Sequence, residues 1–186
     1  MLFPKRSLTL KEIEGLSTTL ALMALDFRPD VVVSIKTGGW YVGEIVSHAL
    51  NLQNHSITIC RENDKDPHGK CSDFKKIISI IRRLFGKPSP LMVLKGLDCE
   101  GSLLKNKKVL VVDDAVHSGK TLALAYEYLG SFEPSQLKSA VVGNVHSSNC
   151  VDYYIYDGVY CYPWSRISKQ YKKFLLIYNA QQFKHI

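Results

Sequence analysis

The fold is decided by the stretch Val109-Leu110-Val111-Val112-Asp113-Asp114-Ala115-Val116-His117-Ser118-Gly119-Lys120-Thr121. Its four leading aliphatic residues predict a buried strand of a parallel sheet, and two adjacent carboxylates stand at the C-terminal end of that strand. A Ser-Gly turn follows and opens a helix. In an open α/β sheet, ligands bind beyond the carboxyl ends of the strands, and the N–H groups of such a turn suit a phosphate. The stretch therefore predicts a phosphorylated sugar, held by the turn at its phosphate and by the carboxylates at its hydroxyls.

A P-loop is the nearest alternative, and it requires Gly-x-x-x-x-Gly-Lys-[Ser/Thr]. The chain matches the end of this motif at Gly119-Lys120-Thr121, but Asp114 stands where the first glycine should be. An aspartate lacks the conformational freedom of glycine, and its charge repels a triphosphate. The sequence therefore argues against a nucleoside triphosphatase.

The stretch instead resembles the signature with which type I phosphoribosyltransferases bind phosphoribosyl pyrophosphate (PRPP). That signature is an aliphatic strand, two acids, a short linker and [Ser/Thr]-Gly-x-Thr. The resemblance implies an α/β fold in which helices flank a central, mostly parallel sheet and a small hood covers the base site. It also implies that the 5-phosphate of PRPP is bound by His117, Ser118, Gly119, Lys120 and Thr121.

A second segment supports the same family. A strand expected at Val31–Ile35 leads into Lys36-Thr37-Gly38-Gly39, about 75 residues before the acids, and this arrangement resembles the diphosphate-binding loop of the family. Taken alone, a strand–Gly–Gly–helix turn is ordinary αβ packing, and two acids after a strand often only cap a helix. Together and in this order they favour the functional interpretation. The resemblance then implies that the diphosphate is bound by Lys36, Thr37, Gly38 and Gly39.

The composition is that of an ordinary globular protein. The 186 residues are 46% hydrophobic and 22% charged, and the net charge of +7 suits an anionic small substrate as well as nucleic acid. No apolar run is long enough to span a bilayer and the first residues lack a secretory signal, so we expect a cytoplasmic protein. We expect a single domain over residues 1–186, with a core at about 8–60 and 105–150, an insertion at about 61–104 and a C-terminal hood at about 150–186.

The cysteines and histidines form no local metal motif. No two of the five cysteines make a C-x-x-C pair, which argues against zinc and favours reduced thiols. Four histidines have no partner at ligand spacing and receive no role: His48, His55, His68 and His185.

Periodicity predicts the remaining elements. A capping box at Thr9 and Glu12 starts a helix that runs to about Leu25, whereas residues 91–107 show no clear pattern. Further helices are expected at Gly43–Leu50, Phe74–Phe85 and Leu122–Leu129, the last with Gly130 as its C′ residue, and strands at Ser56–Cys60, Leu137–Val145, Tyr153–Tyr156 and Val159–Tyr162.

The inserted amphipathic helix over residues 74–85 is the part that the family does not explain. Opposite its apolar stripe lie the basic residues Lys75, Lys76, Arg82 and Arg83. A solvated surface helix is the simpler interpretation, and a dimer contact or an RNA-binding face is the alternative.

The base site is expected in the C-terminal segment. This segment resembles the hood of purine enzymes, where an aromatic or aliphatic residue stacks on the base before a Pro-Trp pair, and both Val159 and Tyr160 fit that place. Two positions depart from those enzymes. His117 replaces an aspartate that accepts a proton from the base, and His146 replaces a lysine that bonds its exocyclic oxygen. Histidine can accept or donate a proton near neutral pH, so His117 is either a catalytic residue or a loop residue that packs.

The resemblance implies transfer of the 5-phosphoribosyl group from PRPP to a nucleobase nitrogen, with a purine favoured and diphosphate released, by a homodimer that uses Mg²⁺. The expected catalytic residues are Asp113, Asp114 and His117. The two aspartates would hold the ribose hydroxyls and contact Mg²⁺ through PRPP and water. Three alternatives stay open: a pyrimidine or modified base as acceptor, a non-catalytic nucleotide sensor that binds RNA, and a nucleotide-binding subunit of a larger complex.

Overall fold

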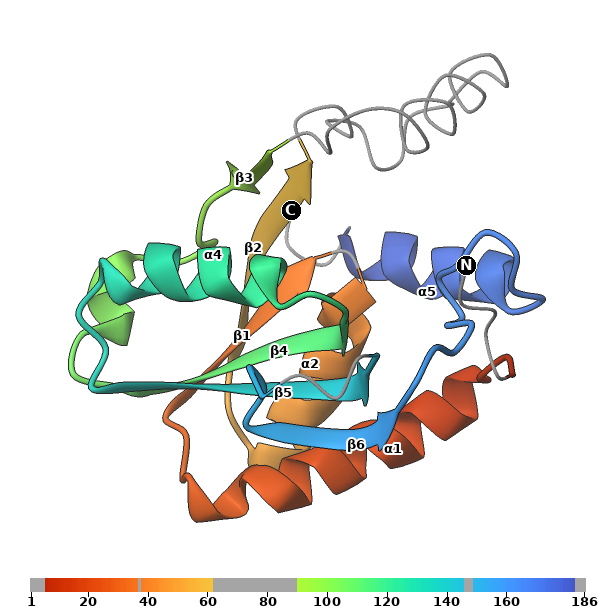
Figure 1. Cartoon of the computed structure of the whole chain (residues 1–186), viewed down its shortest axis with the longest axis horizontal. Helices are drawn as coiled ribbons and strands as arrows, with labels where there is room; N and C mark the ends of the chain where they lie inside the picture. The colour runs from red at the N-terminus through yellow and green to blue at the C-terminus, as the bar shows by residue number, and fades with distance from the viewer. Residues whose placement is uncertain (1–5, 37, 62–89, 146–148, 183–186) are drawn as a thin grey trace.

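A computed structural model describes residues 6–36, 38–61, 90–145 and 149–182 of the chain. In this part of the chain, six strands form one sheet in the order β3-β2-β1-β4-β5-β6 (Figure 1). All neighbouring strands are parallel except β3, which runs antiparallel to β2. The strands are β1 (Val31–Lys36), β2 (Asn54–Arg61), β3 (Leu91–Lys95), β4 (Lys108–Val116), β5 (Gln136–Asn144) and β6 (Tyr153–Asp157). The mostly parallel α/β fold is thereby confirmed.

Helices cover both faces of the sheet. They are α1 (Leu10–Met23), α2 (Gly38–Leu50), α4 (Lys120–Gly130) and α5 (Tyr171–Gln182), with short 3-10 helices at Ala24–Asp26 and Gly101–Leu104. Helices α1 and α2 pack on one face and α4 packs on the other (Figure 1). Within the described ranges, no helix is both long enough and apolar enough to cross a membrane.

Strand β4 shows why both faces must be covered. Leu110 and Val112 belong to the core beneath α1 and α2, whereas Val109 and Val111 belong to the core beneath α4, and none of the four is exposed to solvent. Successive side chains of a strand point to opposite faces, so a continuous aliphatic run is stable only between two layers of helix. The aliphatic run Val109–Val112 therefore places β4 inside the sheet, between two layers of helix.

The order of the strands reverses between β1 and β4. The chain leaves β1 through α2 and returns as β2 on one side, and it leaves β4 through α4 and returns as β5 on the other side. The two strands are direct neighbours, with Val31 beside Val109 and Ser34 beside Val112. A crevice opens beyond the carboxyl ends of the strands at such a switch point. Both turns that the sequence singled out follow these two strands at the switch point.

The first helix begins as predicted. The Glu12 N–H donates to Thr9 Oγ1 at 3.2 Å and the Thr9 N–H donates to the Glu12 carboxylate at 2.8 Å, which completes the capping box. The 3-10 turn that follows carries the helical path to Asp26.

Several elements differ from the predictions. Strand β4 continues to Val116, so both aspartates lie within the strand and not after it. Gly130 is the last residue of α4 and not the C′ residue after it. The N–H groups of Phe132 and Glu133 make 3-10-type hydrogen bonds to the final carbonyls of the helix. The chain therefore turns only at Glu133, where φ is 56°. Helix α5 and strand β3 were not predicted. The expected helix over residues 74–85 lies outside the described residues.

The strand expected at Val159–Tyr162 is also wrong. Only Cys161 pairs, through a single bridge to the N-terminal segment: the Leu8 N–H donates to Cys161 O at 2.9 Å and the Cys161 N–H donates to Arg6 O at 3.0 Å. Pro163 has no N–H with which to continue a ladder. The segment therefore joins the two ends of the chain and does not extend the sheet.

Helix α2 begins immediately beside β4, and this contact requires glycine. A Cβ atom on Gly39 would lie 2.7 Å from Asp113 Cα and 2.8 Å from Val112 O, both of which are backbone atoms that cannot move aside. A Cβ atom on Gly38 would collide with the Asp114 carboxylate. The two glycines thus allow the helix terminus to approach the carboxylates.

We predict that Gly39→Ala lowers the free energy of unfolding by about 3 kcal/mol, because the added methyl group overpacks a rigid contact. Gly15→Ala on α1 is the matched control, since a Cβ atom there meets nothing within 4 Å and should stabilise the exposed helix by about 0.5–1 kcal/mol. Urea unfolding of both variants measures the difference. Equal stabilities of the two variants would contradict the packing argument.

Candidate active site

The candidate phosphate turn, residues 117–121, is built around Gly119. This residue has φ 72°, which a side chain disfavours, and a Cβ atom on it would lie 2.7 Å from Cys150 Sγ. Gly119 is also the N-cap of α4, and it has no side chain with which to bond the N–H groups of the first helical turn. Those groups and the positive end of the helix dipole suit an anion. His117, Ser118 and Lys120 around this turn are exposed.

The candidate diphosphate turn, residues 36–39, lies at the end of β1, the strand next to β4. Lys36 is the last residue of β1 and is half-buried, and α2 begins at Gly38. Burial lowers the pKa of Lys36, while the negative charge of Asp98 acts in the opposite direction. Thr37 lies outside the described residues. Two helix N-termini, from α2 and α4, therefore flank the same switch point from opposite faces of the sheet.

The two carboxylates lie between these helix ends. Asp113 is buried, with 8% of its surface exposed, and its Oδ1 accepts the Asp114 N–H at 2.8 Å. Asp114 is half-buried, and its Oδ1 accepts the Ala115 N–H at 2.8 Å. Burial, reinforced by the charge of Asp114, raises the pKa of the Asp113 carboxyl well above its usual range. The pair therefore resists carrying two negative charges.

Trp164 completes the carboxylate site, and the sequence did not assign it a role. Its Nε1–H donates to Asp114 Oδ2 at 2.6 Å, a charge-assisted hydrogen bond. The Trp164 ring stacks on Tyr162 at 5.1 Å and contacts Phe174 of α5 at 5.5 Å. Tyr162 in turn donates from its hydroxyl to the Asp114 carbonyl at 3.2 Å, and burial raises its pKa so that it keeps this proton. The C-terminal segment thus orients Asp114.

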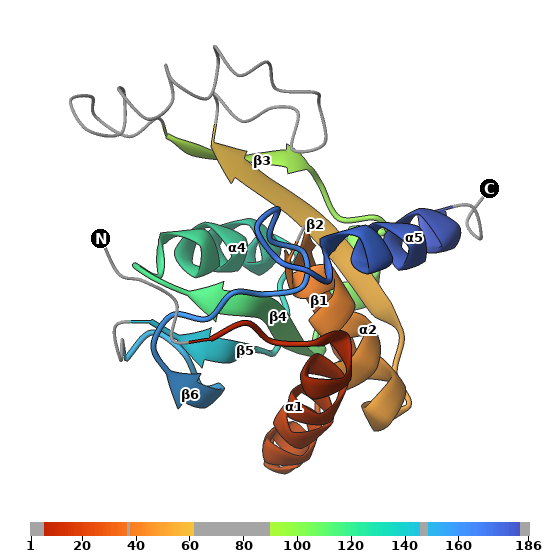
Figure 2. The same ribbon diagram turned by 90° about the vertical axis from the view of Figure 1, so that its right-hand side faces the viewer.

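Helix α5 supports this arrangement from outside. Figure 2 shows it beside the N-terminal end of α2, where Tyr178 meets Trp40 edge-on at 5.1 Å. Phe174 is buried and contacts Tyr41 at 6.1 Å. The Pro-Trp pair was a signal for this role, but sequence spacing could not show which carboxylate the indole would reach.

The candidate base residues lie along the same segment. Val159 and Tyr160 are half-buried and follow a turn at Gly158 (φ 114°). The Tyr160 ring lies 4.0 Å from that of Tyr156, whose hydroxyl approaches the Tyr162 hydroxyl at 3.5 Å. A row of aromatic rings therefore leads from the expected hood to Asp114. His146 lies outside the described residues, so its expected role is not tested.

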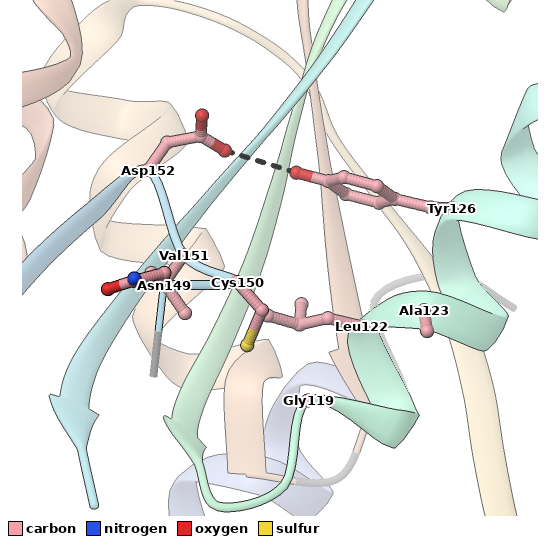
Figure 3. Close-up of a pocket in the computed structure, with 8 residues that line it drawn as sticks. All are labelled: Gly119, Leu122, Ala123, Tyr126, Asn149, Cys150, Val151 and Asp152. Carbon is pink, nitrogen blue, oxygen red and sulfur yellow. Dashed lines mark hydrogen bonds between the residues drawn. The ribbon is translucent and has the colours of Figure 1, made fainter. Parts of the chain in front are cut away.

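A pocket of about 380 Å³ adjoins the phosphate turn on the α4 side (Figure 3). It is lined by Gly119, Leu122, Ala123, Tyr126, Asn149, Cys150, Val151 and Asp152. Tyr126 donates to Asp152 at 3.2 Å, and Asp152 also accepts the Ser139 N–H at 2.7 Å. These bonds fasten the segment before β6 to β5 and α4. The pocket contains neither aspartate of the pair and is a neighbour of the site, not its centre.

The sequence of the chain matches the model of the phosphoribosyl transferase domain family over residues 7–172. The chain belongs to this family. The family assignment agrees with the resemblance of both turns to phosphoribosyltransferase motifs. A comparison with curated proteins found no match.

Several solved structures share the fold, two of the three below being phosphoribosyltransferases by name. A purine phosphoribosyltransferase from Pyrococcus horikoshii Ot3 has a TM-score of 0.67 at 19% identity, covering 88% of this chain and 95% of its own. A hypothetical protein from Neisseria gonorrhoeae with bound ppGpp has a TM-score of 0.67 at 16% identity, and the match covers 97% of this chain and 99% of that protein. A hypoxanthine phosphoribosyltransferase from Staphylococcus aureus has a TM-score of 0.56 at 17% identity, and the match covers 81% of this chain and 75% of that protein. At these identities the likeness shows the fold.

We predict that Trp164→Phe destabilises the protein by about 1.5 kcal/mol, because it removes a hydrogen bond to a carboxylate and keeps an aromatic ring. In an Asp114→Asn background the loss should shrink, which a double-mutant cycle by urea unfolding measures. Trp40→Phe is the control, since Trp40 contacts Tyr178 and Tyr41, and its effect should add to that of Asp114→Asn. Additivity for Trp164 as well would contradict the proposed bond.

We predict a pH-dependent gain in stability for Asp113→Asn. The folded state binds the Asp113 proton more tightly than the unfolded chain, so the stability from this group is complete below the unfolded pKa of about 3.9 and is lost as the pH rises through the raised pKa. Asparagine does not titrate, so the free energy of unfolding of the variant should increase relative to that of the wild type as the pH rises from acid to neutral. Urea unfolding across this range measures the gain. Glu127→Gln, at an exposed position, is the control and should show no such gain. A gain in stability for Asp113→Asn that did not change with pH would contradict the argument.

Proposed function

We propose that this protein transfers the 5-phosphoribosyl group from PRPP to a nucleobase nitrogen, favouring a purine, and releases diphosphate. One observation carries the proposal: two helix N-termini and a pair of carboxylates converge at the switch point between β1 and β4. PRPP is anionic at both ends and carries hydroxyls between them. The site offers donors at its two sides and acceptors in its middle, which is the complementary pattern.

The N-terminus of α4 binds the 5-phosphate, and the N-terminus of α2 binds the diphosphate. The 5-phosphate binds at the N–H groups of residues 117–121, where Gly119 exposes the start of α4. The diphosphate binds at Lys36 and at the first turn of α2, whose glycines leave the backbone uncovered. Because β1 and β4 are neighbouring strands, about 4.8 Å apart, one ligand can span both helix ends.

The carboxylates act on the ribose. Asp113 and Asp114 accept the 2- and 3-hydroxyls and fix the sugar between the phosphate sites. The family's transition state resembles an oxocarbenium ion at C1, so positioning and electrostatics dominate over covalent chemistry. A half-buried Asp114, oriented by Trp164 Nε1, is a preorganised negative group close to the positive charge that develops. The raised pKa of Asp113 suits a group that bonds hydroxyls and shares one charge with its neighbour.

The site fits Mg²⁺ in an indirect role. Mg²⁺ binds oxygen ligands, keeps several waters and is held by few carboxylates together with substrate phosphates. Asp114 Oδ1 and Oδ2 each accept one hydrogen bond, from Ala115 and Trp164, which fixes the carboxylate and leaves it able to accept from water. Because Mg²⁺ keeps several waters, the carboxylates would contact the ion through PRPP and water. When bound, Mg²⁺ neutralises the charge of the leaving diphosphate.

The base lies under the hood. Val159 and Tyr160 supply stacking surface, which contributes about 1–3 kcal/mol per base. His117 and His146 stand where purine enzymes carry aspartate and lysine, and a neutral imidazole can take the proton from the base nitrogen as it attacks. A purine is the favoured acceptor, and a pyrimidine or a modified base is the alternative.

We predict that Asp113→Asn with Asp114→Asn lowers PRPP turnover by about a hundredfold or more, because two preorganised electrostatic partners of the ribose are lost. The assay incubates the protein with PRPP, Mg²⁺ and each common base in turn, and measures diphosphate release. The control variant, Glu127→Gln with Glu133→Gln, removes two exposed charges elsewhere on the molecule. A double variant at the aspartates that kept full turnover would overturn the assignment.

A nucleotide-binding regulator is the second candidate. The Neisseria gonorrhoeae structure, which covers 97% of this chain, holds ppGpp. A guanine nucleotide with two diphosphate groups could use the same helix ends without any reaction. If no base elicits diphosphate release while ppGpp binds and raises the melting temperature, the regulator is favoured. Dimerisation and binding of RNA through residues 74–85 stay predictions, which gel filtration and salt-dependent RNA titration test.

A further inference from the structure

Three side chains of different chemistry meet beside the edge of the sheet, and none belongs to the site above. His55 lies in β2, and Asp98 and Cys99 follow β3. Each offers one ligand atom, and the three atoms all lie within 4.8 Å of one another. The Asp98 N–H donates to Ser56 O at 3.2 Å, which fastens this segment to β2. The grouping joins residues more than forty positions apart, so sequence spacing did not reveal it.

Ser56 orients the carboxylate of this cluster. Its N–H donates to Asp98 Oδ1 at 2.9 Å, and its hydroxyl donates to Asp98 Oδ2. Ser56 is buried, with 4% of its surface exposed. Each carboxylate oxygen accepts two hydrogen bonds or ligand contacts, so Ser56 fixes the plane of the group and leaves an acceptor position on each oxygen. Metal-binding carboxylates are commonly held in this way by outer partners.

The spacing of His55 and Asp98 suits an ion between them. His55 Nδ1 lies 3.4 Å from Asp98 Oδ1, and 17% of the His55 side chain is exposed. An N–H···O hydrogen bond is usually about 2.7–3.2 Å long. Two ligands of a tetrahedral ion with bonds of about 2.1 Å lie about 3.4 Å apart. The observed distance is that of a direct ion pair, and it also accommodates a shared ion.

The donor set selects the kind of ion. Mg²⁺ and Ca²⁺ require oxygen ligands, whereas imidazole and thiolate favour zinc and its chemical neighbours. One thiolate and one carboxylate neutralise a divalent charge. We propose that His55, Asp98 and Cys99 bind a zinc-type divalent cation, with water as the fourth ligand.

Binding replaces the Cys99 S–H bond with a metal–sulfur bond, and the proton leaves to solvent. A small rotation of the three side chains brings their ligand atoms from within 4.8 Å to the spacing of a tetrahedral site. The ion then ties β2 to the chain segment after β3. The expected role is to stabilise this edge of the sheet, so bound metal raises the melting temperature.

The experiment uses the full, untagged chain after removal of metal with a chelator. Competition with a chromophoric chelator measures zinc affinity and stoichiometry, and Co²⁺ reports sulfur ligation through the thiolate-to-cobalt charge-transfer band. We expect one equivalent of zinc, and a cobalt spectrum with that band. Cys99→Ser should abolish the band and weaken zinc binding by about a hundredfold or more, and Ser56→Ala should weaken it about tenfold.

Controls separate the cluster from other donors. Cys150→Ser changes an exposed thiol and His48→Gln an exposed imidazole, and both variants should bind zinc and cobalt like the wild type. Circular dichroism of each variant without metal verifies that it is folded. Absence of stoichiometric zinc binding by the wild type would overturn the proposal. So would a charge-transfer band that survives in Cys99→Ser or disappears in Cys150→Ser.

Discussion

The contact between the first turn of α2 and the end of β4 is the constraint on which the rest of this structure depends. Gly38 and Gly39 bring a helix N-terminus within van der Waals reach of Asp113 and Asp114. The positive end of the helix dipole favours negative charge at this place, which offsets part of the cost of burying a carboxylate. In the proposed function the N–H groups of the same turn bind the diphosphate. Stability and the proposed ligand binding therefore depend on the same contact.

The two ends of the chain complete the site from the other side. Cys161 bonds to the N-terminal segment at Leu8, and three residues later Trp164 reaches Asp114. Phe174 of α5 packs behind the indole. The proposed function has this carboxylate accept ribose hydroxyls, which requires a fixed direction, and rigid aromatic neighbours supply that direction with little loss of side-chain freedom. The buried pair nevertheless costs stability as its second charge forms, a cost that functional sites commonly carry.

Some elements were predictable and others were not, for physical reasons that particular residues illustrate. The aliphatic runs at β1 and β4 and the capping box at Thr9 act through neighbouring residues, so their signals are local. Strand β3 is an edge strand with partly exposed residues, and its pattern is weak. The segment around Cys161 has strand-forming residues but lacks a partner strand beyond one bridge, because Pro163 ends the ladder. Propensity alone could not report that missing partner.

The sequence by itself determined the order of the helices and strands from α1 to β6 apart from β3, the two glycine turns and the carboxylate pair. Strand alternation, helix capping and backbone freedom are set by residues close together in the chain. Only the tertiary structure decided which distant groups meet: Gly39 with Asp113, Trp164 with Asp114, and His55 with Asp98 and Cys99. Those meetings follow from the strand order and from the packing of helices on both faces of the sheet. They depend on the summed free energy of many weak contacts, which no short stretch of sequence encodes.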